Sequence, residues 1–252
     1  MTRILAIANQ KGGVGKTTTA INLGAALAAL ERRVLLVDFD PQGNATRGVG
    51  QTAAPPNLYH VLSGEAEARA AVRPSGFPHL DVIPADRNLV GVEVEFAGLD
   101  GWERRLKDAL QPLLPGYDTI LLDCPPSLGH LTVSALTAAS AVLVPLQCEY
   151  FALEGISELV STVERVRGSS NPGLEIGGIL LTMYDERMNL AQDVAAEARR
   201  HFGRRVFRTV VPRNVRLAEA PSHGVPVLLY DIKCRGAEAY LELAREMLGE
   251  AA

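Results

Sequence analysis

Long apolar runs are missing from this 252-residue sequence. No uninterrupted apolar segment reaches the roughly 18 residues needed to span a bilayer, and the first residues do not read as a secretory signal peptide. The three cysteines, Cys124, Cys148 and Cys234, lack C-x-x-C spacing, which gives no metal motif and fits reduced, packed thiols. We find no linker, internal repeat or low-complexity tract. These absences favour a cytoplasmic protein with one compact domain over residues 1–252.

What the sequence does contain is an alternation of short apolar runs with helical patterns. Strands are expected at 3–8, 34–37, 80–83, 119–122, 141–146, 176–182 and 206–211. Helices are expected at 17–31, 87–98, 103–114, 152–168, 190–202 and 235–249. The proline-containing stretch 48–78 is expected to hold loops and short helices. The alternation predicts an α/β fold, a mostly parallel twisted sheet with helices on both faces.

Residues 11–17, Lys-Gly-Gly-Val-Gly-Lys-Thr, form a glycine-rich loop between the first expected strand and the first expected helix. Glycines there let backbone N–H groups face phosphate oxygens at the positive end of a helix dipole. Lys16 would reach the β and γ phosphates, and the Thr17 hydroxyl would ligate Mg²⁺. The usual phosphate loop has glycine where this chain has Gln10, and it lacks the additional lysine, Lys11. The pattern therefore predicts a phosphate-binding loop of a particular kind.

Carboxylates follow two more of the expected strands. Asp38 and Asp40 end the run at 34–37, and Asp123 ends the run at 119–122 in the manner of a Walker B segment. A single aspartate at a strand end is often only a turn former or a helix cap. In a doubly wound sheet, however, ligands bind beyond the carboxyl ends of the strands, so all three would lie beside the phosphates. Asp123, as the Walker B aspartate, would hold the Mg²⁺ shell, directly or through water.

Four segments together resemble the ParA/Soj family of chromosome- and plasmid-partitioning ATPases. They are Asn-Gln-Lys-Gly-Gly-Val-Gly-Lys-Thr-Thr-Thr-Ala at 9–20, Val-Asp-Phe-Asp-Pro-Gln-Gly-Asn-Ala-Thr at 37–46, Asp-Cys-Pro-Pro-Ser at 123–127 and Val-Pro-Arg-Asn-Val-Arg-Leu at 211–217. The resemblance extends from residue 3 to about residue 245. The two-lysine loop marks the wider deviant Walker A superfamily, and the later segments indicate the partition branch. The resemblance implies a single-domain P-loop NTPase that hydrolyses ATP weakly with Mg²⁺.

The resemblance also implies a role for each matching residue. Lys11 would cross a dimer interface to the partner subunit's phosphates, so that two ATP molecules lie between two chains, while Lys16 serves its own site. Asp40 would position or deprotonate the attacking water, and Asp38 and Asp123 would surround Mg²⁺. Thr18 would contact the α phosphate. The implied nucleotide-binding residues are Lys11, Gly12, Gly13, Val14, Gly15, Lys16, Thr17 and Thr18, with Pro212 and Asn214 near the adenine.

Positive charge is concentrated in residues 183–216, although the chain as a whole has a net charge of −4. This segment has eight arginines and four acidic residues, a net +4, so the rest carries −8. From charge alone, a solvated helix face with internal ion pairs is favoured over a phosphate-reading patch. In Soj-like members of the family that the chain resembles, nonspecific DNA binding uses arginines at positions that match Arg187 and Arg216. The resemblance therefore favours a phosphate-reading patch. Further candidates are Arg199, Arg200, Arg204 and Arg205.

Duplex DNA read through its phosphates is the expected ligand of these arginines, because no aromatic residues are interleaved with them to stack bases. The phosphate loop starts near residue 9, which leaves no room for an N-terminal helix-turn-helix. The resemblance further implies an ATP-dependent homodimer on the nucleoid and a ParB-like centromere-binding partner that stimulates hydrolysis.

Two other functions remain as alternatives. A MinD-like ATPase would end in a basic membrane-binding helix, but residues 235–250 contain two arginines against four glutamates, and their apolar stripe more simply packs on the sheet. A redox enzyme like the nitrogenase iron protein would need bridging cysteines, for which Cys124 is poorly placed. We therefore expect a DNA-segregation switch without membrane binding.

Overall fold

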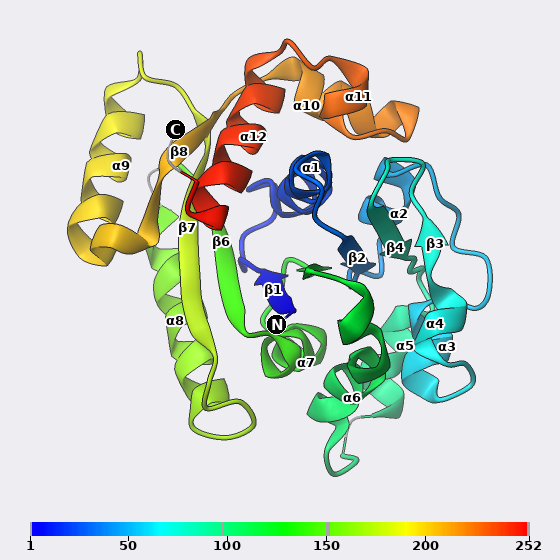
Figure 1. Cartoon of the computed structure of the whole chain (residues 1–252). Coiled ribbons are helices and arrows are strands. Elements are labelled where there is room, and N and C mark those ends of the chain that lie inside the picture. Colours follow the sequence, from blue (N-terminus) through cyan, green and yellow to red (C-terminus); the bar gives the residue numbers. More distant parts are fainter. Residues whose placement is uncertain (1, 97, 150–151, 251–252) are drawn as a thin grey trace.

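The computed structural model describes residues 2–96, 98–149 and 152–250 of the chain. It contains an eight-stranded sheet with helices on both faces (Figure 1). The strand order is β3-β4-β2-β5-β1-β6-β7-β8. The strands are β1 Arg3–Ile7, β2 Val34–Asp38, β3 Arg73–Pro74, β4 Leu80–Ile83, β5 Thr119–Asp123, β6 Ala141–Gln147, β7 Glu175–Tyr184 and β8 Val206–Pro212. Every pairing is parallel except that of the two-residue edge strand β3 with β4. The predicted mostly parallel sheet is confirmed.

Alternate side chains of β1 enter two separate hydrophobic cores. Leu5 and Ile7 belong to one core, and Ile4 and Ala6 belong to the other, as the two-residue period of a strand requires. The first core is covered by α1 Lys16–Ala29, α2 Asn44–Gly48, α10 Val215–Glu219, α11 Val227–Tyr230 and α12 Arg235–Leu248. The second is covered by α3 Leu58–Ser63, α4 Ala68–Ala71, α5 Leu89–Glu95, α6 Arg105–Leu110, α7 His130–Ala138, α8 Ala152–Arg167 and α9 Asn189–Phe202. The short 3₁₀ turns are η1 Trp102–Arg104, η2 Gln111–Gly116, η3 Gly203–Arg205 and η4 Ala220–His223.

The seven predicted strands all exist. Strands buried on both faces, such as β2 and β5, read as continuous apolar runs. Two predicted helices were too long. The helix expected at 87–98 is reduced to α5, and residue 97 lies outside the described residues. The helix expected at 103–114 is divided into η1, α6 and η2, and prolines at 112 and 115 explain why regular helix stops after Leu110. Helix α7 was not predicted.

Helix α12 packs against α1 and β8, with Tyr240, Leu243 and Ala244 buried. Its apolar stripe therefore lies on the sheet, as the sequence predicted. Among the described residues, no helix is long and apolar enough to cross a membrane.

Candidate functional site

The carboxyl ends of the parallel strands share one edge of the sheet, which we call the carboxyl edge. The loop of residues 11–17 follows β1 there, and Gly13 and Gly15 adopt positive φ values of 76° and 90°. These left-handed conformations favour glycine and let the loop turn into α1. Val14 is buried, whereas Gly12 and Gly13 are exposed. The loop thus presents its exposed backbone to solvent directly before the first turn of α1.

Lys16 is 7% exposed and lies under this loop. Its Nζ donates a hydrogen bond of 2.9 Å to the carbonyl oxygen of Lys11. Burial lowers the pKa of Lys16, while the charges of Asp123 and Asp40 act in the opposite direction. A phosphate oxygen would compete with the Lys11 carbonyl for this ammonium group.

Asp38 and Asp123 are direct neighbours, because Asp38 of β2 is in register with Asp123 of β5. Asp123 is in turn paired in register with Ile7, the last residue of β1 before the loop. Both carboxyl groups are fully buried. The Oδ2 atom of Asp38 accepts hydrogen bonds from the N–H (2.7 Å) and the hydroxyl (2.6 Å) of Thr46. Neither oxygen of Asp123 has a hydrogen-bond partner among the described residues.

Burial raises the pKa of both carboxyl groups. The pKa of Asp38 rises to about 6, although the hydrogen bonds from Thr46 work against the shift. The pKa of Asp123 rises well above its ordinary value through burial and then through the charge of Asp38, while Thr17 and Lys16 act in the opposite direction. An unpartnered buried carboxylate is costly unless a cation or a donor satisfies it. The pair is therefore arranged for a positive ligand.

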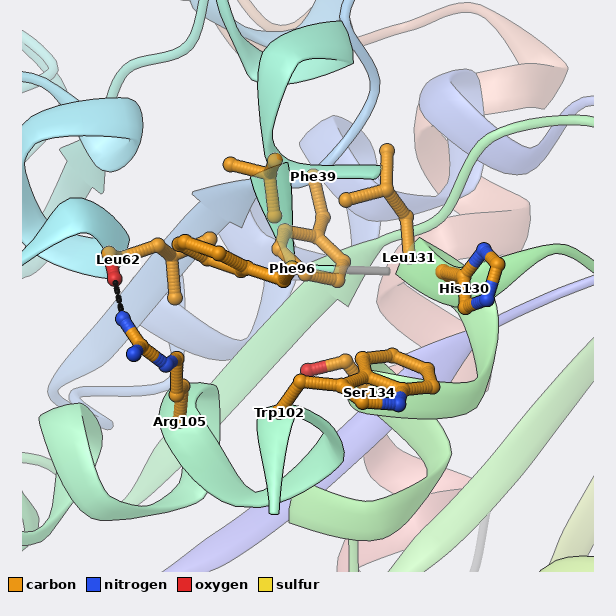
Figure 2. Close-up of a pocket in the computed structure, with 9 residues that line it drawn as sticks. Phe39, Leu62, Phe96, Trp102, Arg105, His130, Leu131 and Ser134 are labelled. Carbon is orange, nitrogen blue, oxygen red and sulfur yellow. Dashed lines mark hydrogen bonds between the residues drawn. The ribbon is translucent and has the colours of Figure 1, made fainter. Parts of the chain in front are cut away.

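Asp40 lies two residues beyond β2 and is 6% exposed. Its Oδ1 accepts the Gln42 N–H at 2.9 Å, which orients the carboxylate. Phe39, between the two aspartates, is fully buried and lines a narrow apolar pocket with Phe96, Trp102 and Leu131 (Figure 2). This aromatic anchor fixes the backbone that carries both carboxylates.

A second cavity, of about 320 Å³, lies beside the phosphate loop. Gly15 and Thr18 line one side, and Pro212 at the end of β8, Asn214 and other residues of the segment that follows line the other. The volume suits a small-molecule site that is mostly apolar with a few polar groups. The Asn214 side-chain oxygen accepts the Arg216 N–H at 2.9 Å, which leaves its amide N–H₂ as a donor. The predicted adenine-contacting residues therefore lie next to the loop.

Lys11 forms an ion pair with Glu149, with 2.6 Å between Nζ and Oε2. No pattern in the sequence indicates this contact, since the two residues are 138 positions apart in the chain. Asn9, Thr46 and Thr182 were also not predicted. Asn9 accepts the Lys11 N–H at 3.0 Å, and the Thr182 hydroxyl donates to the Val14 carbonyl at 2.8 Å.

The predicted arginine patch separates into two groups in the structure. Arg187 follows β7 and Arg216 lies on α10 after β8, so both are near the carboxyl edge (Figure 1). Arg199 and Arg200 lie in the last turn of α9, a 14-residue helix of about 21 Å, and Arg204 and Arg205 lie in η3, just before β8 begins. The arginines that are close together in the sequence therefore do not lie on one surface of the structure.

Both arginines at the carboxyl edge have acidic partners. Arg187 donates to both carboxylate oxygens of Asp185, at 2.9 and 2.7 Å. Arg216 pairs with Glu219 at 2.8 Å and with Asp231 at 3.4 Å. Arg187 has 85% of its side chain exposed, so the pair can open at little cost.

Comparison with known proteins agrees with this geometry. Residues 2–176 match the family model described as an AAA domain. The chromosome partitioning protein ParA of Caulobacter vibrioides is 59% identical over 250 residues, covering 98% of this chain and 94% of the relative. The sporulation initiation inhibitor protein Soj of Bacillus subtilis is 52% identical over 249 residues, covering 98% of each. The chain belongs to the ParA/Soj family of chromosome-partitioning ATPases.

Family membership extends to the fold. A crystal structure described as cobyrinic acid a,c-diamide synthase from Mycobacterium smegmatis, with bound ADP and magnesium, has a TM-score of 0.87 and 40% identity. The match covers 98% of this chain and 94% of that one.

Burial raises the pKa of the Cys124 thiol, which agrees with a packing role rather than a redox role. Among the described residues, no group of three or more His, Cys, Asp or Glu side chains forms a ready metal site. Any cation here would need ligands from elsewhere, such as phosphate and water.

Proposed function

We propose that this chain is an ATP-dependent switch for DNA segregation. ATP binding drives dimerisation and nonspecific attachment to duplex DNA on the nucleoid, and weak hydrolysis reverses both. The observation that supports this most is the convergence at the carboxyl edge. The phosphate loop, Lys16 and the three aspartates all lie there, beside a cavity of about 320 Å³.

Mg²⁺ with ATP fits the residues present. The unpartnered carboxylate of Asp123 and the neighbouring Asp38 supply negative charge, and Thr17 supplies a hydroxyl in the first turn of α1. Magnesium retains several waters and takes few protein ligands, which agrees with carboxylates that hold its water shell. When bound, Mg²⁺ would neutralise charge on the phosphates. Residues 12–15 and Lys16 would hold the β and γ phosphates, Thr18 the α phosphate, and Pro212 with Asn214 the adenine.

Asp40 is the residue we assign to the attacking water. Its carboxylate is held by the Gln42 N–H through one oxygen, which leaves the other oxygen to accept a hydrogen bond from water. Orienting that water in line with the γ phosphate is the main contribution a side chain can make to phosphoryl transfer. Lys11, contributed in trans by a second copy of the chain, would stabilise charge on the transferred group. Hydrolysis would then depend on dimerisation.

DNA attachment is assigned to Arg187 and Arg216. Both project from loops and helices at the carboxyl edge, where phosphate oxygens would replace their carboxylate partners. Phosphate contacts are nearly additive and steeply salt-dependent, so a dimer would bind duplex DNA far more tightly than a monomer. A ParB-like centromere-binding protein is the partner we assign to stimulation of hydrolysis.

Gel filtration and DNA binding, each with ATP, with ADP and without nucleotide, test the proposal. We expect ATP alone to produce a dimer that binds any duplex DNA. DNA binding that does not depend on the nucleotide would refute the switch. ATP-dependent binding to anionic liposomes instead would indicate a membrane-cycling ATPase.

A further inference from the structure

The ion pair between Lys11 and Glu149, which we call the Lys11–Glu149 pair, occupies the lysine that the proposed function assigns to the partner subunit. The ammonium group has three N–H donors, but reaching phosphates bound by a second chain would draw Lys11 Nζ away from the Glu149 carboxylate that it contacts at 2.6 Å. The pair therefore has to open before Lys11 can act in trans.

Both members of the pair are held by β6. The Lys11 N–H donates to the Asn9 side chain at 3.0 Å, and Asn9 in turn donates to the Pro145 carbonyl at 2.7 Å. The Glu149 N–H donates to the Gln147 carbonyl at 2.8 Å, and the Gln147 side-chain amide donates to Glu149 Oε1. Two exposed side chains that met by chance would not share a supporting strand in this way.

The pair also communicates with the phosphate site through the Lys11 main chain. The Lys11 carbonyl accepts the hydrogen bond from Lys16 Nζ at 2.9 Å. A phosphate that recruits Lys16 removes this contact, and the peptide that carries the Lys11 side chain then loses one of its two restraints. Nucleotide binding would thereby weaken the hold on Lys11 within its own subunit, and dimerisation would then open the pair.

We propose that Glu149 is a positioning residue that retains Lys11 within its own subunit and so opposes dimerisation, by a pair that nucleotide binding weakens and dimerisation opens. This inference rests on the proposed function, since it assumes that Lys11 contacts the partner subunit's nucleotide. The side chains are 37% and 46% exposed, so solvent screens the pair. An exposed pair of this kind shifts an equilibrium by roughly 1.5- to fivefold, and two pairs open per dimer, which gives roughly two- to 25-fold.

Glu149→Gln tests the proposal, with Glu158→Gln as the matched control. Glu158 is an exposed residue of α8 with no ion pair among the described residues, so its variant makes the same change in charge without opening the pair. Dimerisation is measured by sedimentation at several protein concentrations with Mg²⁺ and a non-hydrolysable ATP analogue. We expect Glu149→Gln to lower the dimer dissociation constant by roughly two- to 25-fold and Glu158→Gln to leave it unchanged. An unchanged or higher constant for Glu149→Gln would overturn the proposal.

The pair can also be observed directly, because the chain has four lysines, at 11, 16, 107 and 233. In a ¹⁵N-lysine-labelled sample without nucleotide, the Lys11 side-chain signal, assigned with Lys11→Arg, should shift in Glu149→Gln while those of Lys107 and Lys233 stay in place. A Lys11 signal that does not respond would show that the pair is absent in solution. A merely structural defect would instead move several signals.

Lys11→Ala separates failure of this inference from failure of the proposed function. If Lys11→Ala dimerises normally, the trans role of Lys11 is wrong and the inference falls with it. If Lys11→Ala abolishes dimerisation while Glu149→Gln has no effect, only the role of Glu149 is wrong. In the double variant, Glu149→Gln should add nothing to Lys11→Ala.

Discussion

Replacing Asp123 with asparagine should stabilise the nucleotide-free protein. The Asp123 side chain is fully buried, neither oxygen lies in a hydrogen bond of good geometry, and Thr17 and Lys16 offset only part of the penalty of burial. Burying an unpartnered neutral amide costs about 1–3 kcal/mol, and an unpartnered carboxylate pays a larger penalty because it is charged. For a chain of this length each kcal/mol corresponds to about 2–4 °C in Tm, so we expect Asp123→Asn to melt at least about 2 °C higher near pH 7.

The stability of the wild type relative to Asp123→Asn should change with pH in one direction. Because the folded pKa of Asp123 lies above its ordinary value of 3.8, the folded protein binds the proton more tightly than the unfolded chain does. The wild type therefore loses stability relative to Asp123→Asn as pH rises from the unfolded pKa towards the folded pKa, and below the unfolded pKa the difference disappears.

Thermal unfolding followed by circular dichroism between pH 3 and pH 8 measures the effect. Asp118→Asn is a useful control, because Asp118 directly precedes β5, the strand that ends in Asp123. The Asp118 carboxylate accepts a hydrogen bond from the Arg33 N–H at 2.8 Å, so replacing this carboxylate should slightly lower Tm. Mg²⁺ with ATP should raise the Tm of the wild type and fail to do so for Asp123→Asn. A variant that melts below the wild type at pH 7 without nucleotide would refute the reasoning.

Three other substitutions have expected outcomes. Asp40→Ala should bind ATP and dimerise but lose turnover in a phosphate-release assay, and normal turnover would remove its assignment. Arg187→Ala with Arg216→Ala should leave the ATP dimer intact while weakening binding to every duplex; four lost phosphate contacts per dimer should reduce the slope of log K against log salt by up to about 3.6. Gly43→Ala should cost about 1–3 kcal/mol in urea unfolding, because φ is +63° and a Cβ would lie 2.8 Å from the Ala85 carbonyl oxygen; Gly101→Ala, with φ +77° and no atom within 4 Å, should cost less.

The sequence predicted the strands and the residues that follow them because both have a local signature. A strand of a parallel sheet is buried on both faces and reads as an apolar run, and its last residue is then fixed at the carboxyl edge. Asp38 and Asp123 could be placed together in this way before their register was known. Their hydrogen-bond partners could not be predicted, since the bond from the Thr46 hydroxyl to Asp38 and the lack of such a bond at Asp123 depend on packing.

Helix α7 and the arginines show why the remaining features were missed. Helix α7 is short and almost entirely buried, so it has no polar face to give a helical period. The arginines between 183 and 216 were treated as one patch because sequence distance was the only measure available. Arg199 and Arg200 at the end of α9, and Arg204 and Arg205 in η3, lie towards the opposite end of the sheet, which no pattern of charge could indicate.

Thr182 links the phosphate loop to strand β7. Its hydroxyl donates a hydrogen bond to the Val14 carbonyl, the residue is 2% exposed, and Arg187 follows five positions later in the chain. A displacement of the loop therefore either strains this hydrogen bond or moves the end of β7 with the loop. Amide hydrogen exchange in residues 182–187 should consequently report on the nucleotide, although none of these amides belongs to the loop that holds the phosphates.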